Sequence, residues 1–149
     1  MIRDRLIPDL KREFEGWEMT VTPESNPIVR FPAVQEEIGD VVIYDDGDEA
    51  TVCIENITHE HFNPYDDSLD EFTRDGIISE TVIDFLKALF RDEVLLSISA
   101  DKRCAGWIRL DHQAGPAQLS SGHKYFLWSK PYRAVNSEQG GAGNWPPPL

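Results

Sequence analysis

Apolar and polar positions recur with helical spacing in the first part of the chain and alternate shortly afterwards. The apolar residues of the first segment return every three or four positions, at Leu6, Leu10, Phe14 and Trp17. This spacing predicts an amphipathic helix that Asp4 caps and Gly16 ends. Trp17 to Val21 then alternate apolar with polar residues, which predicts a strand directly after the helix.

A β-hairpin is the clearest element in the sequence. Asp40–Tyr44 and Ala50–Ile54 are rich in β-branched residues and flank the turn Asp45–Glu49. Gly47 can adopt the positive φ that such a turn requires. We expect the pairing to end near Ile57 and the following residues, 58–67, to leave the sheet.

Two helical segments are predicted after the hairpin. Ser68 and Glu71 have the spacing of a capping box, which predicts a short helical turn that ends at Gly76. Ser79 is a second candidate N-cap, before a run whose apolar face extends from Val82 to Phe90. Three further strands are expected at 93–100, 106–110 and 125–128.

These elements predict an α+β fold. Most strands connect by hairpins, so we expect a largely antiparallel sheet of five to six strands with an N-terminal helix and one main central helix. Residues 1–133 are predicted to form a single domain. Residues 134–149 contain a Gly run and three consecutive prolines, a composition typical of a disordered tail.

Charge separates the middle of the chain from its ends. The 149 residues include 27 Asp and Glu and 14 Lys and Arg, for a net charge of -13. Residues 36–93 hold eighteen of the acids and three of the bases, whereas residues 94–149 have more bases than acids. A balance this negative disfavours nucleic acid and anionic membranes as partners, because both would repel the protein.

Composition also predicts the compartment. No apolar run approaches the roughly 20 residues of a membrane span, and the first residues lack the apolar stretch of a signal peptide. Cys53 and Cys104 are too few for a disulfide framework. We therefore expect a cytoplasmic protein without membrane association.

The acidic block suggests a binding function. A concentration of like charge attracts an oppositely charged partner and accelerates its association. The predicted partner-binding residues belong to the hairpin turn and to the segment before the central helix: Asp45, Asp46, Asp48, Glu49, Asp66 and Asp67. The predicted function is a non-catalytic interaction module, immunity-like or regulatory, that binds a basic protein.

A metal-dependent enzyme is the first alternative. On an extended chain His59 and His61 project to the same side, and with Asp66 or Asp67 they would make a two-histidine, one-carboxylate metal site. The same residues also fit a polar strand end in which one histidine bonds to the acidic loop. The sequence contains neither a Gly-x-Ser-x-Gly elbow, which a serine nucleophile would favour, nor a phosphate-binding Gly-rich loop. No cofactor is predicted for the binding module.

A structural or assembly domain is the second alternative. In this interpretation the tail at 134–149 reaches a neighbouring copy through Trp145 and the prolines that follow it, and the protein forms an oligomer.

One resemblance adds a fold expectation. The run Tyr44–Glu49, the segment Thr58–Asp67 and the helix Val82–Phe90 resemble a group of small acidic bacterial proteins with a domain of unknown function. The likeness covers about residues 31–110 and implies a compact α+β domain without implying an activity. Size and charge are also similar to those of immunity proteins that neutralise bacterial toxins, which implies a basic toxin as partner.

Overall fold

A computed structural model describes residues 1–112 and 119–132, within which the chain forms two α-helices, nine strands and one short 3-10 turn, η1 (Leu110–His112). The chain divides into two units, residues 1–87 and 88–149. The tail predicted at 134–149, with its suggested role in assembly, lies outside the described residues.

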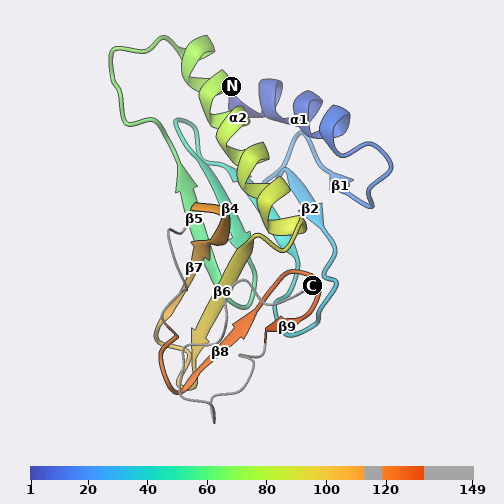
Figure 1. Cartoon of the computed structure of the whole chain (residues 1–149). Helices are drawn as coiled ribbons and strands as arrows, with labels where there is room; N and C mark the ends of the chain where they lie inside the picture. The colour runs from blue at the N-terminus through green and yellow to red at the C-terminus, as the bar shows by residue number, and fades with distance from the viewer. Residues whose placement is uncertain (113–118, 133–149) are drawn as a thin grey trace. The chain divides into compact units, whose positions relative to one another are not determined.

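The first unit contains a five-stranded antiparallel sheet (Figure 1). Its strands are β1 (Thr20–Val21), β2 (Val29–Phe31), β3 (Val41–Asp45), β4 (Ala50–Ile54) and β5 (Thr58–Phe62). Each strand pairs with the next one along the chain, so the sheet is a meander with β1 and β5 at its edges.

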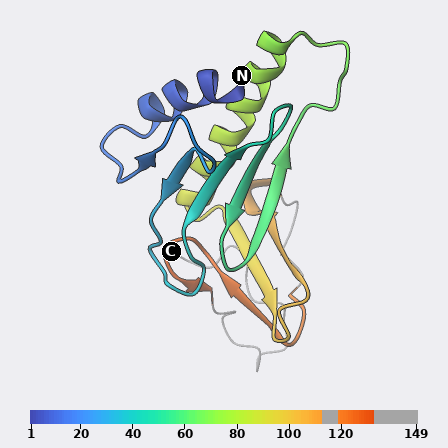
Figure 2. The same ribbon diagram turned by 180° about the vertical axis from the view of Figure 1, so that it is seen from behind.

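Helix α1 (Ile2–Glu13) and the part of helix α2 (Glu71–Phe90) that belongs to this unit lie on one face of the sheet (Figures 1 and 2). Phe14 packs edge-on against Phe31 of β2, and Phe85 of α2 packs against Phe62 of β5. The apolar residues between these layers are buried and include Ile2, Leu6, Leu10, Ile43, Ile54, Ile78, Val82 and Leu86. Burial of each such side chain contributes about 1.5–3 kcal/mol.

Asp9 links the two helices. Its buried carboxylate accepts hydrogen bonds from the Ser79 hydroxyl at 2.6 Å, from Arg5 at 2.9 Å and from Arg12 at 2.9 Å. Burial by itself raises the pKa of Asp9, but these three donors outweigh it and hold the pKa below its usual range. The bonded Ser79 lies inside α2 and cannot act as the N-cap expected from the sequence.

The second unit contains a four-stranded antiparallel sheet in the order β7-β6-β8-β9. The strands are β6 (Val94–Ser99), β7 (Ala105–Arg109), β8 (His123–Phe126) and β9 (Pro131–Tyr132). Leu95, Leu127 and Tyr132 form its apolar cluster. The Asp92 carboxylate accepts hydrogen bonds from the backbone N–H and the hydroxyl of Ser129, which joins the end of α2 to the turn after β8.

The predicted α+β class is confirmed, but the strands are arranged differently from the expectation. Two sheets of five and four strands replace the single sheet of five to six strands. The segment expected to leave the sheet at Thr58 forms β5, because Ile57 turns the chain back and Thr58 pairs with Ile54. The short turn and the main helix expected after Ser68 are one helix, which passes through Gly76 without interruption.

Arg3 joins the start of α1 to the end of β3. Its guanidinium Nε donates to Asp45 Oδ2 at 2.9 Å, and its backbone N–H donates to the same oxygen at 3.2 Å. Gly47 N–H donates to Asp45 Oδ1 at 3.0 Å. Only 1% of the Asp45 side chain is exposed, so Asp45 cannot bind a partner as the sequence suggested.

No helix within the described residues is both long enough and apolar enough to span a membrane.

We expect Asp45→Asn to destabilise the protein by about 2 kcal/mol near neutral pH, because charged hydrogen bonds to Arg3 are lost. Burial raises the pKa of Asp45, but the donors from Gly47 and Arg3 lower it below the ordinary 3.8. A depressed carboxyl pKa stabilises the fold above that ordinary value, and this stability is lost as the pH falls through the folded pKa. Urea unfolding from neutral to acidic pH measures the effect, with exposed Asp48→Asn as the control. If the difference in unfolding free energy between the wild type and Asp45→Asn did not change with pH, the stabilising role of the charged Asp45 would be contradicted.

Alanine substitutions at two glycines with positive φ distinguish the cost of steric crowding from the cost of backbone strain. An alanine Cβ at Gly39 (φ +78) would lie 2.9 Å from Glu55 Cβ, whereas at Gly47 (φ +94) it would meet nothing within 4 Å. We expect Gly47→Ala to cost about 1–2 kcal/mol through left-handed strain alone. Gly39→Ala should cost about 1–3 kcal/mol more, because a neighbour must move. Equal losses in urea unfolding would show that the crowding near Glu55 has no energetic effect.

Candidate functional site

One end of the five-stranded sheet carries most of the acidic residues predicted to bind a partner. Antiparallel pairing places Asp45 opposite Ala50 and Ala50 opposite Phe62, so the turn 46–49 and the segment 63–70 leave the sheet at the same end. The starts of α1 and α2 lie there too (Figures 1 and 2). We call this surface the acidic end; its carboxylates are Asp46, Asp48, Glu49, Asp66, Asp67, Asp70 and Glu71.

Hydrogen bonds hold several of these carboxylates in place and in their charged form. Asp66 accepts from the hydroxyl and the backbone N–H of Ser68, at 2.6 and 3.0 Å, and these bonds lower the pKa of Asp66. Asp70 accepts from the Thr73 N–H at 2.7 Å, which lowers the pKa of Asp70 and caps α2 in place of the expected Ser68. Both groups are exposed, so their negative charge faces solvent.

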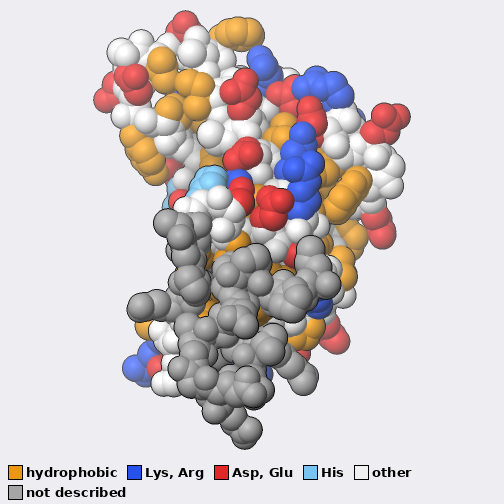
Figure 3. Space-filling model, in the orientation of Figure 1, with side chains coloured by type: hydrophobic (Ala, Val, Ile, Leu, Met, Phe, Trp, Pro, Cys, Tyr) orange, Lys and Arg blue, Asp and Glu red, His pale blue; other side chains and the backbone are white. Residues whose placement is uncertain are grey.

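Bases are interspersed with acids elsewhere in the first unit. Arg30 pairs with Asp40 at 2.8 Å and with Glu55 at 3.0 Å, and Lys87 pairs with Glu13 at 2.6 Å. Figure 3 shows red and blue side chains side by side on part of the visible surface. Such pairs cancel most of their charge. Among the described residues, none of the carboxylates of the acidic end forms an ion pair with Lys or Arg, and seven of them gather at this one end.

Large exposed side chains lie among these carboxylates. Tyr65 is 75% exposed, Phe72 is 77% exposed and Met1 is 62% exposed. Tyr65 also has a positive φ of 53°, which is uncommon for a bulky residue, and its N–H donates to Asn63 Oδ1 at 2.7 Å. Backbone strain of this kind occurs mostly at functional positions.

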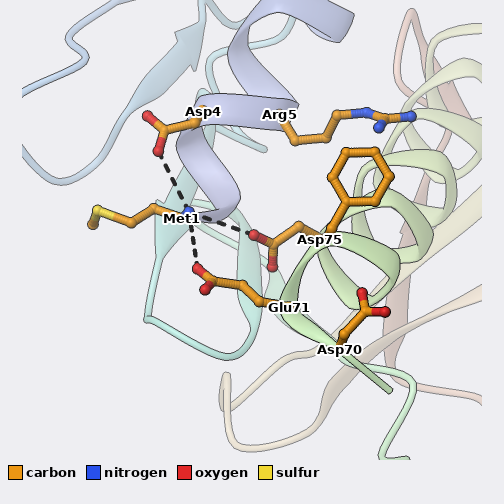
Figure 4. A pocket seen from close by; sticks show the side chains of 7 residues that line it. Met1, Asp4, Arg5, Asp70, Glu71 and Asp75 are labelled. Atoms are coloured by element: carbon orange, nitrogen blue, oxygen red, sulfur yellow. Dashed lines mark ion pairs between the residues drawn. The ribbon is translucent and has the colours of Figure 1, made fainter.

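The starts of the two helices border a pocket of about 670 Å³. Figure 4 shows the carboxylates of Asp4, Glu71 and Asp75 pointing toward the Met1 amino group, at 3.4, 3.0 and 3.6 Å. The hydrogen bond to Glu71 is the main cause of the raised pKa of this ammonium. On another side of the pocket the Arg5 guanidinium lies 5.8 Å from the centre of the Phe72 ring.

The histidines form a different group from the one expected. His59 and His61 lie on the same side of β5, with ring centroids 5.1 Å apart. His61 Nδ1 faces Glu49 Oε1 at 3.1 Å and Thr51 Oγ1 at 2.9 Å. Three possible ligand atoms, one each from Asp46, Glu49 and His61, lie within 4.8 Å of one another. Asp66 bonds to Ser68 instead, so the set of His59, His61 and Asp66 is not the one assembled.

Sequence reasoning therefore located the turn and the loop of the acidic end but not all of its members. Asp46, Asp48, Glu49, Asp66 and Asp67 come together, while Asp45 is buried. Tyr65 and Phe72 were missed. The available signal for Tyr65 was an aromatic residue within the polar run from Asn63 to Asp67; nothing in the helical pattern separated Phe72 from the apolar residues of the core.

Comparisons with protein-family models, with curated proteins and with solved structures found no match to this chain.

Proposed function

We propose that this protein is a non-catalytic binding module whose acidic end docks a basic protein. The observation that carries the proposal is the combination of exposed carboxylates with Tyr65 and Phe72 on one end of a rigid sheet. Exposed carboxylates alone, or single exposed aromatic residues alone, also occur on surfaces that bind no partner.

The two kinds of side chain have complementary roles at an interface. Carboxylates that have no Lys or Arg partner within the described part of the chain attract a basic surface and favour its correct orientation. Exposed aromatic rings supply large contact area at low entropic cost, and such rings dominate the energy of many interfaces. The Asx bonds of Asp66 and Asn63 restrict the conformations of the loop, which reduces the entropy lost on binding.

The partner class follows from this chemistry. A basic protein, such as a toxin or another nucleic-acid-binding protein, presents Arg and Lys side chains that can each contact a carboxylate. Nucleic acid itself would be repelled by the acidic end. Cys53 and Cys104 are both free thiols, which supports a cytoplasmic location for the complex.

Removal of charge from the acidic end should weaken capture of the partner. A bait with Asp48→Asn, Asp66→Asn and Asp67→Asn loses three rim charges of about 0.5 kcal/mol each, so we expect about tenfold weaker binding. Pull-downs from the native cells at about 50 mM and about 500 mM NaCl measure the difference, and high salt should abolish capture by the wild-type bait.

The matched control removes the same charge from the other end of the sheet. Glu15 and Glu18 follow α1, and Glu36 lies in the loop between β2 and β3; all three are exposed. A bait with Glu→Gln at these positions should capture as well as the wild type. If it loses as much binding as the acidic-end bait, net charge and not location is responsible, and the proposal fails.

The aromatic residues should contribute to binding without contributing to stability. We expect Phe72→Ala to weaken capture about tenfold or more while unfolding changes by less than about 0.5 kcal/mol. Tyr65→Gly should weaken capture and stabilise the fold by about 1 kcal/mol, because glycine tolerates the left-handed φ. Val34→Ala is the control, since Val34 is 61% exposed in the loop between β2 and β3. Unchanged capture by both aromatic variants would contradict their role.

A further inference from the structure

We propose that Asp46, Glu49 and His61 form a divalent-metal site, for which Zn²⁺ is the best fit. The ligand set combines one imidazole nitrogen with two carboxylate oxygens, which is a donor set that Zn²⁺ accepts readily. A purely acidic cluster would offer oxygen alone, so the imidazole is the feature that favours a transition metal over Ca²⁺ or Mg²⁺.

The separations fit a tetrahedral ion. With metal–ligand bonds of about 2.1 Å, two ligand atoms of a tetrahedral Zn²⁺ lie about 3.4 Å apart. His61 Nδ1 and Glu49 Oε1 are 3.1 Å apart, and all three ligand atoms lie within 4.8 Å of one another.

The backbone holds the three residues on a rigid frame. His61 lies directly opposite Thr51 in the pairing of β4 with β5. The Asp46 N–H donates to the Glu49 carbonyl at 2.9 Å and closes the hairpin turn. Both ends of the turn therefore have fixed positions relative to His61.

Thr51 orients two of the ligands. Its hydroxyl donates to Asp46 Oδ2 at 2.5 Å and lies 2.9 Å from His61 Nδ1. Because the single hydroxyl proton goes to Asp46, the contact with His61 is a hydrogen bond from the Nδ1–H to Thr51 Oγ1, and a cation that binds Nδ1 would take the place of that proton. The His61 side chain remains 45% exposed, so the site is open to water as a fourth ligand.

Charge supplies the driving force. Within the described part of the chain neither Asp46 nor Glu49 pairs with Lys or Arg, because Arg3 is bonded to the neighbouring Asp45. Two carboxylates held this close repel each other, and a bound cation removes the repulsion.

The test is calorimetric titration of the full chain, purified without an affinity tag, with ZnCl₂. We expect one Zn²⁺ per chain with a Kd of about 10 μM or tighter. His61→Ala and Asp46→Asn should each weaken binding by about tenfold or more. Neither change should prevent folding, since both side chains are exposed and His61 lies on the edge strand.

His112→Ala is the matched control. His112 is an exposed histidine whose Nε2 lies 3.8 Å from Asp111, but among residues 1–112 and 119–132 it does not belong to a group of three possible ligands. We expect it to bind Zn²⁺ as the wild type does. No binding up to about 1 mM Zn²⁺, or equal binding by His61→Ala and the wild type, would overturn the site. The docking proposal rests on pull-down of a basic protein and is unaffected by either result.

Discussion

The antiparallel pairing of β4 with β5 brings the hairpin turn, the loop after β5 and His61 to the same end of the sheet. Its register places Ala50 opposite Phe62 and Thr51 opposite His61. A shift of one residue would turn His61 to the other face of the sheet and separate it from Glu49, because side chains alternate along a strand. The turn before β4 and the loop after β5 are neighbours only because this register holds.

A second constraint keeps the helices at the same end. Arg3 bonds to Asp45 at the end of β3, and Ser79 of α2 bonds to Asp9 of α1. Buried polar groups need partners, so these bonds leave few alternative positions for either helix. The carboxylates of Asp9 and Asp45, which stabilise the fold in this way, are not available to a partner. The acidic residues therefore form two groups: buried ones that stabilise the fold and exposed ones that face solvent.

The exposed acidic residues are distributed in a way that solubility alone does not require. Charged residues that only maintain solubility work well when both signs are interspersed, as they are around Arg30. At the acidic end, Tyr65 and Phe72 lie among carboxylates and are exposed. The backbone at Tyr65 has a positive φ, which is strained for an aromatic residue. His61 adds an imidazole to the same region, so the docking role and the cation site that we propose would share one surface.

Local sequence signals were sufficient where a segment's own residues decide its conformation. The β-branched runs around Gly47 predicted the hairpin, and the spacing of Leu6 and Leu10 predicted α1. Local sequence signals failed where the hydrogen-bond or pairing partner of a residue lies far away in the chain. Ser79 looks like an N-cap but bonds to Asp9, Asp45 looks like a turn carboxylate but bonds to Arg3, and the polar strand β5 forms because β4 offers it a free edge. The sequence by itself determined the α+β class and the acidic composition. Only the tertiary structure decided which acids are buried, which face solvent and which meet His61, because hydrogen bonds between residues far apart in the chain depend on the pairing of whole elements.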